Sequence, residues 1–394
     1  MRIVSCTFSS LVLVLVAATE TLGYADDIDL PADDSLQIHG FVSQGFLKSS
    51  DNNFLANSKD GSFEFWEAGI NFTKPLTERL RTGFQLFSRD LGPVGDYKAK
   101  IDWAYLDYQW KDWLGLRAGR IKLPWGLYND SSDIDSAHPT ALLPQSVYPT
   151  TNRDFLLAQT GVELYGYRSF EELGALEYRA YAGTIYIDLP AQPAGNPIGL
   201  VKLTIPYVVG GRLMWETPHD GLRLGFSAQK LRLETSLLDL RNPMIPNPVT
   251  ANVPATLAVA SLEYVKDDVL FAAEYSRWYT SVESSDPTVV PETSTRNDRA
   301  YALVAYHARP WLQPSAYYSV YYPDFHKREH GPSVKQHDTA AAMRFDLNRY
   351  WILKLEGHYM RGTAALSTSL NPGRTLDHLP DHWLLFVAKT TVYF

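Results

Sequence analysis

The stretch that decides the fold is the last one, His382-Trp-Leu-Leu-Phe-Val-Ala-Lys-Thr-Thr-Val-Tyr-Phe394. Its apolar residues recur at every second position, as in a strand with one apolar face, and Lys389 and Thr391 lie on the opposite face. The chain ends on an aromatic residue in mid-strand, so we expect no loop after the final strand. This pattern favours a sheet closed on itself, in which the last strand pairs with the first. The alternative is an ordinary terminal strand of a soluble sheet protein.

The other end of the chain has the pattern of a secretory signal. Met1-Arg2 is a short positive region, residues 11–18 are an apolar core, and Gly23-Tyr24-Ala25 supplies small residues for cleavage. We therefore predict a signal peptide over residues 1–25, a short acidic segment over 26–35 and a single barrel over 36–394. The only cysteine, Cys6, lies within the predicted signal, so disulfides are expected to play no part in the exported protein.

Composition is compatible with a membrane barrel. The chain has 24 Tyr, 17 Phe and 10 Trp residues, yet no apolar run after the signal is long enough for a transmembrane helix. In strands that alternate apolar-out and polar-in, the hydropathies of the two faces cancel in any average over the sequence. This explains the slightly polar mean hydropathy of −0.21. The formal net charge of −8 gives no reason to propose nucleic acid as a partner.

Alternating segments follow one another from Leu36 to the C-terminus, joined in turn by short and long connections. Short turns are expected near residues 74–78, 111–112, 266–268 and 347–349, and longer loops near 189–198, 236–254, 323–334 and 363–380. The pattern predicts an all-β fold: a transmembrane antiparallel β-barrel of about 16 strands, with short periplasmic turns and long extracellular loops.

Charged residues are confined to one face of many predicted strands. Arg81 and Gln85 oppose Phe84, and Lys354 and Glu356 oppose Leu355. A charge on the lipid-facing side costs about 2–4 kcal/mol near the bilayer midplane, so this confinement indicates a wet lumen. A soluble sandwich also alternates, with its polar side outward, and only the signal, the terminal aromatic residue and the loop rhythm separate the two. Aromatic residues next to turns, such as Trp110, indicate interfacial girdles, with core packing as the alternative.

Two local sequences resemble those of Gram-negative outer-membrane porins. The aromatic ending resembles the C-terminal assembly signal of outer-membrane barrels, which assigns that role to Phe394. Leu116-Arg-Ala-Gly-Arg-Ile-Lys-Leu-Pro-Trp-Gly-Leu-Tyr-Asn-Asp130 is similar to the fifth strand of general and phosphate-selective porins, where it runs into the third loop. The lysine-rich selectivity loop of the phosphate-selective branch is not evident in this sequence. The resemblance covers essentially the whole mature chain.

The resemblance implies a function, a location and partners. It implies a water-filled channel for passive diffusion of small hydrophilic solutes or ions across the outer membrane of a Gram-negative bacterium. It also implies contact with outer-membrane lipid and with the outer-membrane assembly machinery, and assembly as a homotrimer. Small residues on early strands, Gly69, Gly83 and Ala104, would let barrels approach closely.

The longest connection, residues 123–158, is the candidate for an inward-folded third loop. Four prolines stiffen it, and its apolar residues from Leu142 to Leu157 favour packing against the inner wall. The alternative is packing over the mouth or against a neighbouring barrel. Opposed rows of charge would make a constriction with a transverse field; the candidates are Arg81, Arg89, Arg117 and Lys122 on strands and Asp130, Asp133, Asp135, Arg153 and Asp154 in the loop. Both signs occur, so ion preference stays open. Solvated charges on rims and loops are the alternative, but Arg81 and Arg117 lie on the lumen face of their strands, which favours the pore.

Signals for enzymatic chemistry are weak. There is no phosphate-cradling glycine motif and no Gly-x-Ser-x-Gly elbow, and the ten histidines are scattered; His326 and His330 stand four apart, but in a predicted loop. We therefore expect no catalytic residues, no metal, no cofactor and no nucleic-acid partner. The alternatives to a porin are a blocked-lumen structural or adhesive barrel and a lipid-active barrel enzyme.

Overall fold

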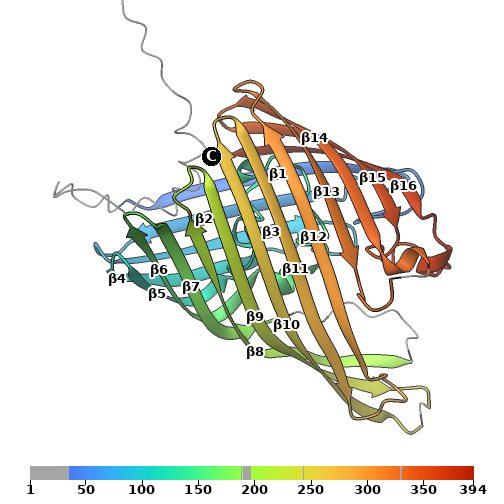
Figure 1. Cartoon of the computed structure of the whole chain (residues 1–394). Helices are drawn as coiled ribbons and strands as arrows, with labels where there is room; N and C mark the ends of the chain where they lie inside the picture. Colours follow the sequence, from blue (N-terminus) through green and yellow to red (C-terminus); the bar gives the residue numbers. More distant parts are fainter. Residues whose placement is uncertain (1–34, 188, 190–196, 243, 329–330) are drawn as a thin grey trace, which may run out of the picture.

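Sixteen antiparallel strands close into one barrel in the computed structural model, which describes residues 35–187, 189, 197–242, 244–328 and 331–394 (Figure 1). In chain order the strands are β1 (Gln37–Ser49), β2 (Trp66–Pro75), β3 (Leu80–Asp90), β4 (Lys100–Lys111), β5 (Leu114–Lys122), β6 (Ala158–Phe170), β7 (Gly174–Ile185), β8 (Ile198–Glu216), β9 (Leu222–Asp239), β10 (Asn247–Lys266), β11 (Val269–Ser284), β12 (Thr293–Tyr306), β13 (Leu312–Tyr322), β14 (Gln336–Asn348), β15 (Trp351–Gly362) and β16 (His382–Tyr393). The predicted barrel and its strand number are confirmed.

The barrel closes where the two ends of the chain meet. β1 pairs with β16 in a register that sets Phe41 opposite Tyr393. Beyond that pair, the Phe394 amide donates to the Gly40 carbonyl at 3.0 Å, and the Gly40 amide donates to the Phe394 carbonyl at 3.1 Å. A Cβ at position 40 would lie 2.7 Å from the Phe394 ring, so glycine leaves room for that ring at the seam. The terminal residue thus completes the closing ladder.

Deleting Phe394 should impair assembly of the barrel. The deletion removes two hydrogen bonds at the seam as well as the aromatic ring, and each such bond contributes about 0.5–1.5 kcal/mol. We expect reduced surface levels and a reduced heat-modifiable folded band on gels. Phe394→Tyr, which keeps the ring and the backbone bonds, is the control. Unchanged surface levels of the deletion would contradict the assigned role.

The predicted signal peptide and nearly all of the predicted acidic segment lie outside the described residues, which begin at Ser35. Among the described residues, no helix is both long and apolar enough to cross a membrane.

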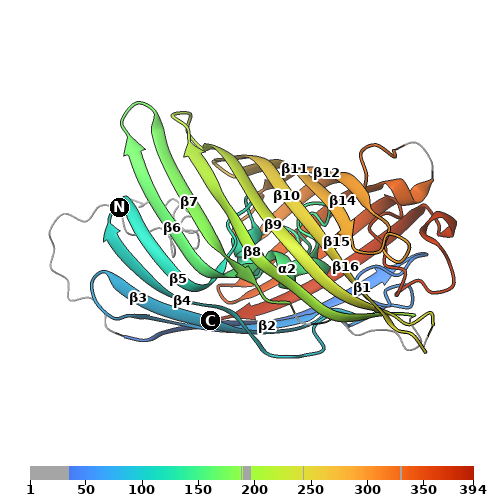
Figure 2. The same ribbon diagram turned by 90° about the horizontal axis from the view of Figure 1, so that it is seen from below.

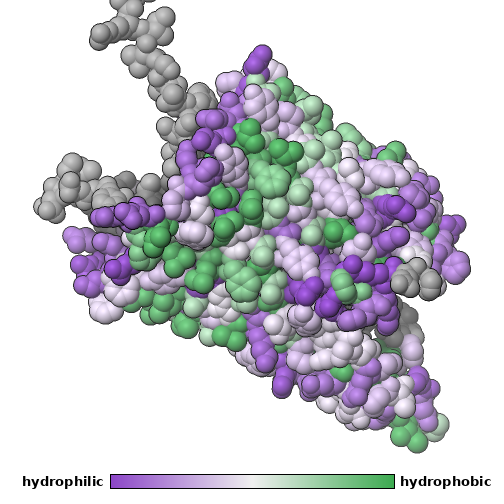
Figure 3. All heavy atoms as spheres, viewed as in Figure 1, coloured by the Kyte–Doolittle hydropathy of each residue, from purple (hydrophilic) through white to green (hydrophobic). Residues whose placement is uncertain are grey.

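The two faces of the strands separate as predicted. Phe84 and Leu86 on β3 are each 40% exposed on the outer wall, whereas Gln85 between them is buried in the lumen. Trp110, Trp113, Trp311 and Trp351 are exposed beside the short turns, where interfacial girdles are expected. Figure 3 shows the resulting apolar band, in green, over the outer wall.

Short turns lie at one end of the barrel and long loops at the other. β8, β9 and β10, of 19, 18 and 20 residues, are longer than their neighbours, and they reach beyond the other strands in Figure 1. The first and last long loops, residues 50–65 and 363–381, pack together: the Asn53 amide donates to Asn371 Oδ1 at 3.0 Å. The Phe54 ring of the first loop also lies 5.5 Å from the Trp383 ring on β16. The third loop, residues 123–157, is called L3 below.

Candidate functional site

L3 leaves the end of β5 and folds into the lumen, as predicted. It contains four single turns of helix, η1 (Asn129–Ser131), η2 (Asp135–Ala137), η3 (Thr150–Asn152) and α2 (Arg153–Leu156), and Figure 2 shows α2 inside the ring of strands. Gly126 turns the chain with a φ of 63°, and a Cβ there would lie 2.4 Å from the Tyr148 hydroxyl. Glycine therefore permits both the turn and the close approach of Tyr148.

One half of L3 forms an apolar core with the lumen wall. Trp125 and Tyr148 stack with ring centroids 5.3 Å apart, and both are buried. Apolar wall residues from β7 to β14 pack against this half of L3; they include Tyr181, Val208, Leu231, Leu257, Trp278 and Leu303. The expected packing of the apolar residues of the loop against the inner wall is therefore confirmed, and this part of the lumen face is covered by L3.

Glu274 on β11 anchors the apolar half by hydrogen bonds. Its carboxylate accepts from the Leu127 amide at 2.9 Å, from Ser261 Oγ at 2.5 Å and from the Tyr301 hydroxyl at 2.8 Å. The Tyr148 hydroxyl donates to the same carboxylate. A buried carboxylate satisfied by this many donors fixes the position of the loop that supplies two of them.

The other half of L3 is held by charges on β15 and β16. Asp135 lies 3.1 Å from Lys354 Nζ and 3.3 Å from Lys389 Nζ, and Thr391 donates to it as well. Lys354 also donates to the Thr140 carbonyl at 2.9 Å. Burial by itself would raise the pKa of Asp135, but the two ammonium groups outweigh it and hold that pKa below its usual range.

Charges on β3, β4 and β5, which lie beyond β1 and β2 from that wall, also hold L3. Asp133 lies 2.5 Å from Lys122 Nζ, and Arg153 donates to both carboxylate oxygens of Asp102 at 2.7 Å. Arg89 donates to Asp154 at 2.9 Å. The pKa of Asp133 lies below its usual range, because Lys122 and Arg153 outweigh the effect of burial. Together with Glu274 on β11, which lies across the barrel from β4, these contacts fix L3 to wall strands on opposite sides of the lumen.

All nine predicted constriction residues lie inside the barrel, but they form three groups. Lys122, Arg89, Asp133, Arg153, Asp154 and Asp135 take part in the contacts that hold L3. Asp130 lies 2.7 Å from Arg179 and 3.5 Å from Arg212, two wall arginines that the sequence analysis did not select. Arg81 and Arg117 share the wall carboxylate of Asp107 at 2.7 and 3.1 Å. Their role in conduction stays a prediction.

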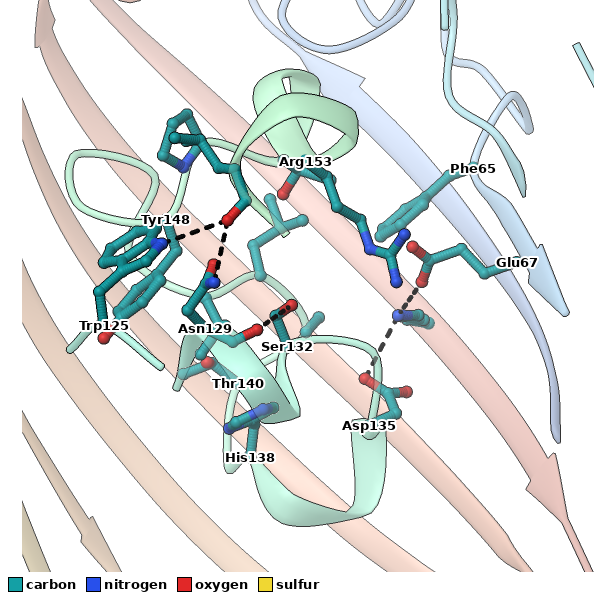
Figure 4. Close-up of a pocket in the computed structure, with 17 residues that line it drawn as sticks. Phe65, Glu67, Trp125, Asn129, Ser132, Asp135, His138, Thr140, Tyr148 and Arg153 are labelled. Carbon is teal, nitrogen blue, oxygen red and sulfur yellow. Dashed lines mark hydrogen bonds and ion pairs between the residues drawn. The ribbon is translucent and has the colours of Figure 1, made fainter. Parts of the chain in front are cut away.

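A small cavity, called the throat below, is lined mostly by L3 and on one side by Phe65, Glu67 and Lys389 at the wall of β2 and β16 (Figure 4). The cavity has a volume of about 60 Å³, room for only a few water molecules. Glu67 and Lys389, paired at 2.8 Å, line it from the wall, and Asp135, His138 and Arg153 line it from L3. Lys389 also lies 3.3 Å from Asp135, so the charges of the wall and of L3 are in direct contact at one edge of the cavity.

Five residues that contact L3 or line its cavity were not predicted from the sequence: Glu67, Glu274, Lys354, Glu356 and Lys389. Alternation on β15 and β16 placed Lys354, Glu356 and Lys389 on the polar face. Their partnership with L3 depends on the path of the loop through the lumen, for which strand periodicity carries no signal. Glu356, for example, accepts from the Ala141 amide at 2.6 Å, a backbone contact that no residue pattern could indicate.

His138 makes the docking of L3 sensitive to pH. Its ring is 3% exposed, and Nε2 lies 2.9 Å from the Ser131 carbonyl, while Nδ1 is buried without a hydrogen-bond partner among the described residues. Burial, reinforced by repulsion from Lys354 and only partly offset by Asp133 and Asp135, lowers the pKa of His138 to about 4. Docked L3 therefore favours the neutral imidazole.

Acidification should weaken this docking between pH 6.5 and about 4. A released His138 takes up a proton below its ordinary pKa of 6.5, whereas the docked one does so only near 4, so docking loses about 3 kcal/mol over that range. We expect larger or more variable single-channel conductance as the pH falls, and His138→Gln, neutral throughout, should remove most of this change. A wild-type conductance that is constant from pH 7 to 4.5 would contradict the prediction.

Among the described residues, no group of three or more His, Cys, Asp or Glu side chains could hold a metal ion. The sequence-based expectation of no metal and no cofactor stays a prediction.

Comparison with known proteins finds matches in structure only. No family model and no curated protein matches the chain. The outer-membrane expressed OmpT of Vibrio cholerae is 12% identical, with a TM-score of 0.59 and coverage of 93% of this chain and 99% of that one. An anion-selective porin from Comamonas acidovorans is 12% identical, with a TM-score of 0.56 and coverage of 91% and 99%.

Two further solved structures have a similar fold. The outer membrane channel DcaP of Acinetobacter baumannii is 10% identical, with a TM-score of 0.51 and coverage of 94% of this chain and 100% of that one. A trimer form of the Vibrio cholerae OmpT is 11% identical, with a TM-score of 0.53 and coverage of 91% and 99%. At these identities the likeness concerns the fold, and the chain has the barrel fold of outer-membrane porins.

Proposed function

We propose that the protein is a porin-like channel of a Gram-negative outer membrane, through which small hydrophilic solutes or ions diffuse passively. The path runs through the throat between docked L3 and the wall of β2 and β16. The observation that carries this proposal is the set of opposed charges where L3 meets the lumen wall: Lys389 on β16 binds Glu67 on β2 at 2.8 Å and Asp135 on L3 at 3.3 Å, and Arg153 of L3 lines the same cavity. Such a throat admits small polar species and discriminates between ions of opposite sign.

Charge removal in the throat should change ion selectivity. Glu67→Gln removes one negative charge from the throat wall without changing the side-chain size. A charge about 5 Å from a permeating ion changes its energy by about 0.8 kcal/mol even at the permittivity of water, roughly fourfold in relative permeability. We expect the reversal potential in a low-salt gradient to shift toward anion preference.

The matched control for Glu67→Gln is Glu78→Gln. Glu78 lies exposed in the short turn between β2 and β3, outside the throat, and its loss removes the same charge. The control should leave the reversal potential at the wild-type value. Equal reversal potentials for wild type and Glu67→Gln would place the permeation path elsewhere.

The proposal includes no chemistry, so purified protein should hydrolyse neither lipids nor peptides. It also includes assembly as a homotrimer, in keeping with the trimer form among the structural neighbours. Gly69 and Gly83 do not support this assembly, because they lie on the lumen face of β2 and β3 with Glu67 and Gln85, and a Cβ at Gly69 would meet the Phe41 ring at 2.5 Å. Native mass spectrometry from mild detergent tests the trimer, and a sole monomer species would contradict it.

A blocked-lumen structural barrel is the second candidate. It is favoured by the anchoring of L3 on opposite walls, with Glu274 on β11, Asp102 on β4 and Lys354 on β15 all binding the same loop. Single-channel recording in planar bilayers separates the two candidates. A channel gives unitary currents with L3 in place, whereas a plugged barrel gives none until L3 is removed.

A further inference from the structure

Charged residues lie on the outer wall where β11, β12 and the loop after β13 meet. Arg277 on β11 is flanked on the same face by Tyr275 and Tyr279, which are 42% and 48% exposed, whereas the alternate residues Ser276 and Trp278 are buried on the lumen side. β12 carries Asp298 opposite Arg277, so Asp298 also faces outward. Arginine on the outside of a barrel is costly in contact with lipid chains unless it meets an anion.

Three guanidinium groups share the single carboxylate of Asp298. Arg277 lies 2.8 Å from it, Arg328 3.2 Å and Arg296 3.7 Å. Three positive charges against one negative charge leave a formal charge of +2 at this point of the outer wall. Asp324 in the same loop is 3.5 Å from Lys327, so it faces a cation of its own. The group of Arg277, Arg296 and Arg328 is called the exterior arginine cluster below.

The cluster is built and held in place by aromatic side chains. The Phe325 ring lies between Arg296 and Arg328, with guanidinium carbons 3.4 and 3.3 Å from its centroid. The Phe325 amide donates to the Arg296 carbonyl at 2.7 Å, which fixes the loop on the outside of β12. The Nε atoms of Arg296 and Arg328 are buried and lack hydrogen-bond partners among the described residues. The side chains of the cluster are therefore held in place, and two of their N–H donors have no hydrogen-bond partner among the described residues.

A groove of about 580 Å³ lies beside the cluster on the outer wall. Arg296 and His326 border it on one side and Lys230 on the other, with Tyr279 and Thr256 between them. Below it on β12, the outward residues Ala302 and Val304 belong to the apolar band. Figure 3 shows this band giving way to hydrophilic residues, in purple, toward the loop end of the barrel.

We infer that the exterior arginine cluster and its groove bind the phosphorylated headgroup of a lipid in the leaflet at the loop end. Guanidinium forks match phosphate oxygens, and a net charge of +2 offers one phosphate its counter-charge. The apolar wall below receives the acyl chains, which is why the ligand is a membrane lipid rather than free phosphate. The inference rests on the proposed membrane location, but it is independent of conduction.

The test measures binding of the full mature protein, in detergent, to hexa-acylated lipid A carrying its phosphates, with the dephosphorylated lipid as comparison. The variant Arg296→Gln with Arg328→Gln removes two guanidinium groups. The matched control, Arg309→Gln with Arg349→Gln, removes the same charge from exposed turns at the other end of the barrel. We expect the first variant to raise the Kd for phosphorylated lipid A roughly tenfold or more, and the control to leave it unchanged.

Two further measurements keep the test decisive. Arg296→Lys with Arg328→Lys retains the charge and should recover part of the affinity, which a misfolded loop would not. Inorganic phosphate alone should compete poorly, because it brings no acyl chains. The inference is overturned if the Gln variant binds lipid A like the wild type, if the dephosphorylated lipid binds equally well, or if inorganic phosphate binds as tightly as lipid A. Bilayer conductance of the same Gln variant should stay at the wild-type value, so failure of the channel proposal would show separately.

Discussion

Removing L3 is expected to raise the single-channel conductance severalfold. Replacing residues 128–152 by a short Gly-Ser linker takes away η1, η2, η3 and the charges of Asp133 and Asp135, and it opens the space enclosed by sixteen strands. A barrel of this size encloses an aqueous channel when no segment fills it. The measurement is unitary current in planar bilayers at fixed salt and voltage.

The control for this deletion shortens the eighth loop by residues 367–374, most of which are exposed and lie outside the lumen. That variant should conduct like the wild type. If the L3 deletion folds, as judged by heat-modifiable migration, and still conducts no better than the wild type, L3 does not set the width of the path.

Lys354→Met should loosen L3 with the second largest effect. Lys354 is fully buried and binds Asp135 and the Thr140 carbonyl, so its loss leaves a buried carboxylate with one cation fewer. Breaking a buried ion pair by removing one partner costs about 3–5 kcal/mol. We expect the free energy for opening of L3, measured by amide hydrogen exchange within residues 133–142, to fall by that order.

Lys266→Met is the matched control for Lys354→Met. Lys266 pairs at 3.7 Å with the largely exposed Asp220 beside a short turn, and exposed pairs contribute about 0–1 kcal/mol. Exchange in L3 should be unaffected by this change. Equal protection of L3 in Lys354→Met and wild type would show that the apolar core alone holds the loop.

Much of the fold could be predicted from local periodicity. The terminal strand, the alternation around Gln85 and the rhythm of short and long connections gave the barrel, its strand number and its closure, because each depends on a period of two along one segment. The inward course of the third loop also followed, since its prolines and apolar residues needed a surface to pack on. These features are determined by residues close together in the sequence.

The partners of L3 could not be predicted in the same way. Asp135 meets Lys354 and Lys389, more than two hundred residues away, through the path of a loop that has no period. The wall residues that complete the apolar core, such as Leu257, could not be identified, because they looked like ordinary members of an alternating strand. The grouping of Arg81 with Asp107 rather than with L3 likewise depends on strand neighbours, which the register supplies.

The most direct test of the central claim, that solutes pass beside a docked L3, is the unitary conductance of a cross-linked protein. Ser146 in L3 and Ser319 on β13 have hydroxyl oxygens 2.7 Å apart, and the only native cysteine, Cys6, lies in the predicted signal. Ser146→Cys with Ser319→Cys should form a disulfide in intact membranes. The account predicts that the oxidised protein gives the same unitary currents as the wild type. A cross-linked protein that conducts nothing, while its reduced form conducts, would contradict it.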